Sequence, residues 1–268
     1  MAIAIPSAWS QARGYRPPPN YLSTGKPDQA EGARILSEFH QAGIAGTYWL
    51  DFTLRVMPRE GAETVVAGQM IGTRSDQGPL TRLMVGPRQW LIQTGLQPAT
   101  WTTGEGKEPQ LMTAAATLDP LAGTDFTVFD LQMPFLYWTD FVYEGLARIR
   151  GRPAHSFVLY PPADLAASRP GLTGVRVLLD TQFQALVQAE FLGDKSVVEK
   201  TISILDLKKV GDHWIPKSID FRNQVTRGKT RFTVVAAALD LVLPPETFDP
   251  AALNSPAPVV ASDRVERL

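Results

Sequence analysis

The sequence predicts a mainly β protein built around one antiparallel sheet that curls. Many segments alternate polar and apolar residues with the period of two that a half-buried strand requires. Turn signals rich in Gly, Pro and Asp separate these segments, and only one early segment has the apolar spacing of a long helix. A chain of 268 residues with this pattern fits a single sheet better than several domains.

The composition excludes several classes of protein. Hydrophobic residues make up 44% of the chain and charged residues 20%, which is typical of a globular protein with a sizeable core. The formal net charge of -1 leaves no basic excess to neutralise phosphates, so we expect no nucleic-acid partner. With 0 cysteines, the chain has no disulfide, zinc–thiolate site or cysteine nucleophile. No apolar run reaches the roughly 18 residues of a membrane-spanning helix.

Residues 1–25 are expected to form a flexible N-terminal arm or the remnant of a signal peptide. They contain short apolar stretches and "RPPPN", but they lack the basic region that opens a complete signal peptide. A helix is predicted over 28–41, because Asp28 can cap it and apolar residues recur with helical spacing. Gly43 and Gly46 are expected to end this helix. Its apolar stripe comprises Ala33, Ile35, Leu36 and Phe39.

Strands are predicted along most of the remaining chain. In "TYWLDFTLRVM" (47–57) every second residue is apolar, so Leu50, Phe52 and Leu54 are expected on one face. Pro216 lies within another such segment and favours an edge or a bulge there. The other segments predicted as strands or strand-like are 63–74, 80–86, 88–95, 138–151, 155–162, 174–180, 185–192, 200–210, 214–225 and 230–241.

The segments between these strands are predicted as loops and short turns. Residues 97–109 are rich in Thr, Gly and Pro, which favours a loop, and 161–172 is expected to be a long loop. A short helical turn is expected near Asp249, and residues 254–268 as a polar tail. No composition shift marks a boundary, so we expect residues 26–253 to form a single domain.

No constellation of catalytic or metal-binding residues emerges from the sequence. No two histidines have the spacing of metal ligands. Four aspartates around the most aromatic part of the chain leave two interpretations open, an acid–base pair or helix caps and solvated groups. Neither G-x-S-x-G nor G-x-x-x-x-G-K-[ST] occurs, so we predict no enzyme, no cofactor and no metal. The residues concerned are His40, His155 and His213, and Asp119, Asp125, Asp130 and Asp140.

The most informative stretch is "LDPLAGTDFTVFDLQMPFLYWTDF", which we call the aromatic segment (residues 118–141). Thr124 or Asp125 could cap a short helix here, and Pro134 prevents a long one. Its rings either plug an ordinary core or form a mobile cover over an apolar pocket. We predict a gate over 125–138, with Gly123 as its hinge. The gate residues are Phe126, Phe129, Met133, Phe135 and Trp138.

From about residue 118 to 253 the chain resembles the outer-membrane lipoprotein-sorting proteins, the LolA-like and LolB-like periplasmic carriers. The resemblance rests on "LAGTDFTVFDL", on "YEGLARIRGRPAHSFVLYPP", on "GDHWIP" followed by "TRF", and on "LPPETFDPAAL". These motifs are structural rather than catalytic. The resemblance implies an incomplete, half-open β-barrel that short α-helices cover, with an apolar cavity for acyl chains.

The cavity is expected on the more apolar face of each strand. Trp214 and Ile215 are expected in the same apolar wall. The predicted cavity residues are Leu50, Phe52, Leu54, Trp90, Ile92, Phe141, Tyr143, Phe157, Val177, Leu179, Phe221 and Phe232.

Three classes of function remain open at this point. The first is a carrier or chaperone of a lipid or acylated protein in a bacterial envelope, where a membrane protein acts as donor or acceptor. The second is an envelope sensor or scaffold that binds a partner protein through the same sheet, whose open edge can accept a strand. The third is an enzyme that uses the cavity, which we do not favour. For the carrier we expect a periplasmic monomer.

Overall fold

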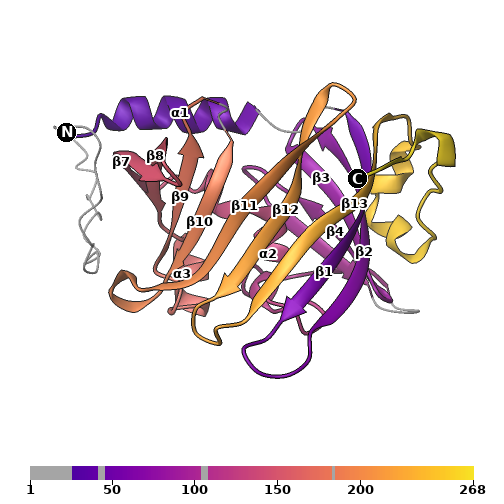
Figure 1. The fold of residues 1–268 in the computed structure, drawn as a ribbon, viewed down its shortest axis with the longest axis horizontal. Helices are drawn as coiled ribbons and strands as arrows, with labels where there is room; N and C mark the ends of the chain where they lie inside the picture. Colours follow the sequence, from indigo (N-terminus) through magenta and orange to yellow (C-terminus); the bar gives the residue numbers. More distant parts are fainter. Residues whose placement is uncertain (1–25, 42–45, 104–107, 183–184) are drawn as a thin grey trace, which may run out of the picture.

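The computed structural model describes residues 26–41, 46–103, 108–182 and 185–268, so the predicted arm over 1–25 lies outside the described residues. Within the described ranges, 14 strands form one antiparallel sheet in the order β6-β5-β4-β3-β2-β1-β13-β12-β11-β10-β9-β8-β7 (Figure 1). The short strand β14 pairs with β13. The end strands β6 and β7 do not pair with each other, so the sheet curls without closing. The predicted mainly β, incomplete barrel is confirmed.

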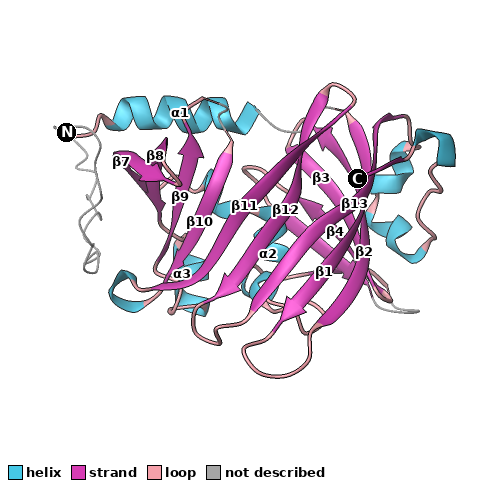
Figure 2. Ribbon diagram, viewed as in Figure 1, coloured by secondary structure: helices cyan, strands magenta, loops and turns pink. Residues whose placement is uncertain are grey.

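Most strands match the predicted segments, but β5, β6 and β14 were not predicted as strands. Helices are few in the described residues (Figure 2). The strands are β1 (Thr47–Met57), β2 (Thr64–Ser75), β3 (Gly78–Val85), β4 (Arg88–Gln93), β5 (Ala99–Thr103), β6 (Gln110–Leu111), β7 (Phe141–Ile149), β8 (Arg152–Leu159), β9 (Gly174–Asp180), β10 (Leu186–Leu192), β11 (Val198–Val210), β12 (His213–Asn223), β13 (Lys229–Leu241) and β14 (Glu266–Arg267). The helices are α1 (Gln29–Gln41), α2 (Val128–Gln132) and α3 (Ala163–Ser168), with 3-10 turns η1 (Ala115–Leu118), η2 (Pro134–Tyr137), η3 (Asp194–Ser196), η4 (Pro245–Phe248), η5 (Pro250–Asn254) and η6 (Ser262–Arg264).

The topology consists of two meanders, β1 to β6 and β7 to β13, joined through the β1–β13 pair. Sequential strands pair because short turns join them. The strand that ends the first meander, β6, and the strand that begins the second, β7, are the two opposite edges of the sheet. The connection between them must therefore cross from one edge to the other, and it contains α2 and most of the aromatic segment.

Strand β1 shows why the concave face is closely packed. Leu50, Phe52 and Leu54 are buried at every second position, as the alternation predicts. Gly68 lies directly opposite Phe52 on β2, and a Cβ atom there would lie 2.4 Å from the ring. The ring of Phe52 thus occupies the space that a side chain at Gly68 would fill. This contact packs β1 against β2 over the core.

Helix α1 lies across one end of strands β7–β10 (Figure 1) and agrees with the prediction over 28–41. The Asp28 carboxylate accepts a hydrogen bond of 2.9 Å from the amide of Ala30 and so caps the first turn, as predicted. The side-chain amide of Gln29 donates to the carbonyl of Tyr143 (2.9 Å) and accepts from its amide (2.8 Å). Helix α1 therefore satisfies backbone groups on the edge strand β7.

Two local predictions need a correction, and a third is confirmed. Residues 97–109 are not simply a loop, because β5 pairs with β4 there and β6 begins at Gln110. Trp214 does not belong to the apolar wall: it is 63% exposed, since its neighbour Ile215 takes the inward position. The prediction for Pro216 is confirmed, because β12 pairs with β13 only over 218–222 and the register with β11 shifts beside Pro216.

The last residues of the chain, expected as a polar tail, lie against the sheet. The amide of Leu268 donates to the carbonyl of Val235 at 2.9 Å, next to the short β14. The helical turn predicted near Asp249 is confirmed, since its carboxylate caps η5 through the amide of Ala251.

Candidate functional site

The aromatic segment fills the concave face of the sheet. Phe126 and Phe129 are 1% exposed and Phe135 is 0% exposed. The ring of Phe126 lies 5.0 Å, between centroids, from that of Phe221 on β12. The rings of Phe129 and Phe135 each lie 5.8 Å from that of Phe191 on β10. These are ordinary distances for packed aromatic pairs, so the segment and the sheet share one core.

Helix α2 is short because the sequence limits it at both ends. The amide of Asp130 donates to Thr127 Oγ1 (3.1 Å) and the Asp130 carboxylate accepts from the amide of Thr127 (2.7 Å), a complete capping box. The predicted caps at Thr124 and Asp125 are wrong, because the helix begins later. Met133 ends the helix with a positive φ of 45°, followed by Pro134. Five residues are too few for a stable isolated helix, so packing must hold α2 in place.

Polar contacts hold the segment against the sheet at two points. The amide of Asp125 donates to Thr230 Oγ1 on β13 at 2.8 Å. The side-chain amide of Gln132 donates to the carbonyl of Gln93 on β4 at 2.9 Å and to Thr100 Oγ1 on β5 at 3.2 Å. These bonds span the concave face from β13 to β5.

A contact from α1 holds the turn that follows α2. His40 Nε2–H donates to the carbonyl of Leu136 at 2.7 Å, and the His40 ring stacks on Tyr137 with centroids 4.3 Å apart. Burial lowers the pKa of His40, which favours the neutral ring. His40 is thus a structural contact of the segment, not a metal ligand in this arrangement.

The middle of the segment carries a buried ion pair. The Asp130 carboxylate, 0% exposed, lies 2.5 Å from the ammonium group of Lys200 on β11, whose side chain is 15% exposed. Lys200 Nζ lies 5.6 Å from the ring centroid of Phe191 and 5.9 Å from that of Phe221. Burial raises the pKa of Asp130, and the charge of Lys200 opposes that rise. Among the described residues, Asp130 Oδ1 has no hydrogen-bond partner.

The structure brings the predicted cavity and gate residues together in one core cluster. Every predicted cavity residue is buried except Phe141, which is partly buried against the cluster. Among the predicted gate residues, Met133 and Trp138 are also only partly buried. That these residues line a ligand cavity and form a gate stays a prediction, because in this conformation they pack against each other.

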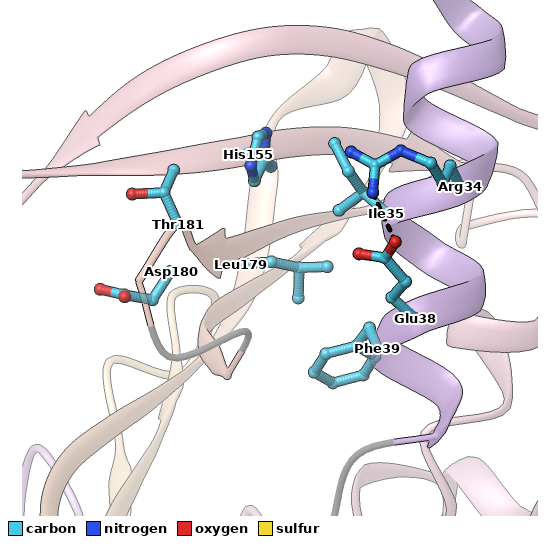
Figure 3. Close-up of a pocket in the computed structure, with 8 residues that line it drawn as sticks. All are labelled: Arg34, Ile35, Glu38, Phe39, His155, Leu179, Asp180 and Thr181. Carbon is cyan, nitrogen blue, oxygen red and sulfur yellow. Dashed lines mark hydrogen bonds and ion pairs between the residues drawn. The ribbon is translucent and has the colours of Figure 1, made fainter.

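A small cavity of about 180 Å³ lies between α1 and the ends of β8 and β9 (Figure 3). Figure 3 shows Ile35 and Phe39 of α1 facing Leu179, with the ion pair of Arg34 and Glu38 at the helix surface. Leu179 is the predicted cavity residue that reaches it. Cavities of about 150 Å³ hold benzene, whereas drug-sized ligands need roughly 300–1,000 Å³. This cavity is therefore too small for a long acyl chain.

The polar wall of this small cavity includes His155. Its Nδ1 is 2.8 Å from the hydroxyl of Tyr143, and burial lowers its pKa. Within the described ranges, no group of three or more His, Cys, Asp or Glu side chains is placed to hold a metal ion. Nor does any described helix have the length and apolar character needed to cross a membrane.

Sequence reasoning found the aromatic positions but missed Lys200, Gln132 and Thr230. Lys200 had a detectable signal, because it shares its strand face with Ile202 two positions later, and a lysine at an inward position requires an anion. The partner itself lies 70 positions away in sequence and has no local signature.

A family model described as "Uncharacterized protein" matches residues 105–255, more than half of the chain. A putative outer-membrane lipoprotein-sorting protein domain from Vibrio parahaemolyticus is 14% identical, with a TM-score of 0.72 over 84% of this chain and 97% of its own. A DUF1329 family protein from Desulfovibrio piger is 11% identical, with a TM-score of 0.72 over 85% and 100% of the two chains.

A LolA superfamily protein from Nitrosomonas europaea is 12% identical, with a TM-score of 0.61 over 81% of this chain and 96% of its own. A search of curated proteins finds no match. At these identities the structural likeness establishes the fold alone, and that fold is the one that the resemblance predicted.

Proposed function

The chain belongs to the family matched over residues 105–255 and has the fold of the LolA superfamily, and on that premise we propose that it is a carrier. It binds the acyl chains of a lipid or lipoprotein in an apolar cavity and transports them within a bacterial cell envelope. One observation carries the proposal: the concave face of the sheet is apolar, and a separate aromatic segment rather than a second sheet covers it.

The driving force is the transfer of acyl chains from water to this face. Each buried CH₂ group contributes about 0.8 kcal/mol, so a long chain supplies enough free energy to compete with packed side chains. The rings of Phe126, Phe129 and Phe135 occupy the space that the chain takes. Ligand affinity is therefore lowered by the free energy that favours the closed state. Such competition makes release reversible, which a carrier requires.

The remaining parts of the proposal concern location and partners. A carrier of this kind operates in the periplasm, receives its cargo from one membrane-protein donor and delivers it to an acceptor, and acts as a monomer without catalysis. The Vibrio parahaemolyticus domain is described as a putative outer-membrane lipoprotein-sorting protein, which supports cargo of this class for the present chain.

The direct test is extraction of the purified protein with organic solvent, followed by mass spectrometry of the extract. Acyl species at a defined ratio to protein support the carrier. A binding titration with a fluorescent fatty acid complements it, under native and mildly loosening conditions. If the probe binds under neither condition and the extract contains no lipid, the carrier is rejected. A protein partner that co-purifies instead of lipid favours the scaffold.

A further inference from the structure

Lys200 places a positive charge on the apolar concave face. It lies on β11, and Ile202, two residues along on the same face of the strand, is 0% exposed. Its ammonium group lies 5.6 Å from the ring centroid of Phe191 and 5.9 Å from that of Phe221. A cation in such surroundings needs an anionic partner, because desolvation of an unpaired charge is strongly unfavourable.

The anionic partner comes from the cover and not from the wall. Asp130 belongs to α2, and its Oδ2 atom accepts from both Lys200 and the amide of Thr127. Movement of the aromatic segment away from the sheet removes this carboxylate together with the rings of the segment. Lys200 would then remain on an apolar surface without a counter-charge. A ligand that replaces only the rings leaves that charge unpaired.

Resting on the proposed carrier function, we propose that the cargo is an acyl chain with a carboxylate head group, that is, a fatty acid. Its carboxylate takes the place of the Asp130 carboxylate on Lys200, and its chain takes the place of the rings of Phe126, Phe129 and Phe135. The closed protein thus holds an internal copy of its ligand: a carboxylate joined to apolar groups. The unpaired Asp130 Oδ1 atom is consistent with this exchange, because the closed state does not fully satisfy the carboxylate it holds.

The test compares two probes that differ only in the head group, dodecanoate and dodecanol. Affinities of both are measured by calorimetry or by displacement of a fluorescent probe. The wild-type protein is expected to bind dodecanoate more tightly than dodecanol. Lys200→Met should weaken dodecanoate binding about ten-fold to hundred-fold, the usual effect of losing a hydrogen bond to a charged group. It should not weaken dodecanol binding, because loss of the Lys200–Asp130 pair also destabilises the closed state.

Two further variants separate charge from folding. Lys200→Arg keeps the charge and should retain the preference for dodecanoate. Lys200→Met leaves Asp130 buried without a partner, so the double variant Lys200→Met with Asp130→Asn provides a neutral pair that folds without this conflict. It should bind dodecanol like the wild type and show no preference for dodecanoate. Asp130→Asn alone removes the internal competitor and should strengthen dodecanoate binding.

The outcomes distinguish the two proposals. If the wild type binds neither probe, the carrier function itself fails. If it binds both probes equally and Lys200→Met changes neither affinity, the carrier stands and the fatty-acid inference is overturned. Selective loss of dodecanoate binding in Lys200→Met and in the neutral pair, with dodecanol binding preserved, supports the exchange of carboxylates at Lys200.

Discussion

Removal of two rings from the aromatic segment, Phe129→Ala with Phe135→Ala, distinguishes a gate from an ordinary core. Both side chains are buried, with their ring centroids 5.9 Å apart. Each buried Phe→Ala change typically costs about 3–5 kcal/mol. The two residues contact each other, so the double change should cost less than the sum of the single changes. Against a usual domain stability of about 5–15 kcal/mol, the double variant should remain folded but with little margin.

The gate predicts a specific pattern in the presence of ligand. Loss of the two rings weakens the closed state, so ligand affinity should equal or exceed that of the wild type. Saturating ligand should restore part of the lost stability, about 2.7 kcal/mol at a concentration one hundred times the dissociation constant. Urea unfolding with and without dodecanoate measures both quantities, and each single variant is measured first.

Phe157→Ala provides the matched control for this experiment. Phe157 is 0% exposed and packs on β8 against Tyr143, outside the aromatic segment. Its removal should cost a similar free energy of unfolding. Because Phe157 is also a predicted cavity residue, its removal should weaken rather than improve ligand affinity. If the double variant loses stability and ligand binding together, and ligand restores nothing, then the aromatic segment is ordinary core and the reasoning is wrong.

The remaining predictions concern single local features. Gly68→Ala should cost about 1–3 kcal/mol in urea unfolding, because the new methyl group meets an aromatic ring, whereas Gly171→Ala, which faces open space, should stay within about 0.5 kcal/mol. Thr127→Ala should cost about 1 kcal/mol through loss of the capping box, and Thr127→Ser should recover most of it. Burial lowers the pKa of His40 below 6.5, so the unfolded chain binds more protons just below that pH. The stability that depends on His40 is thus complete above pH 6.5 and declines as the pH falls through the lowered pKa. The melting temperature of His40→Gln should therefore depend less on pH than that of the wild type. An equal pH dependence in the two proteins would contradict this role of His40.

The elements that the sequence predicted well are those whose pattern is local. The strand β1 has the predicted bounds because Leu50, Phe52 and Leu54 alternate with less buried residues, and a shift by one residue would invert that pattern. The helix α1 agrees because its cap and apolar stripe lie within one segment. By contrast, β5 was missed because its Thr-rich sequence has no apolar alternation, and pairing with β4 decides its conformation.

The candidate site was predictable in its apolar part only. The apolar side chains that alternate along each strand all point to the same face of the sheet, so the predicted cavity residues do meet in one cluster. The start of α2 had a sequence signal that was overlooked, since Thr127 and Asp130 have the spacing of a capping box. The pairing of Asp130 with Lys200 had no such signal, because it depends on how the connection crosses the sheet.

That crossing would let the proposed gate open without loss of the sheet. The aromatic segment connects the two edge strands, β6 and β7, and none of the described strands pairs through it. The one isolated bridge in it, Pro120 with Thr127, joins two parts of the segment itself. Displacement of the segment therefore breaks side-chain packing, a buried ion pair and a few hydrogen bonds. It breaks none of the pairing between neighbouring strands from β6 to β7. Because sheet pairing remains intact, opening costs mainly apolar packing and one ion pair. A bound acyl chain with its own carboxylate can replace both.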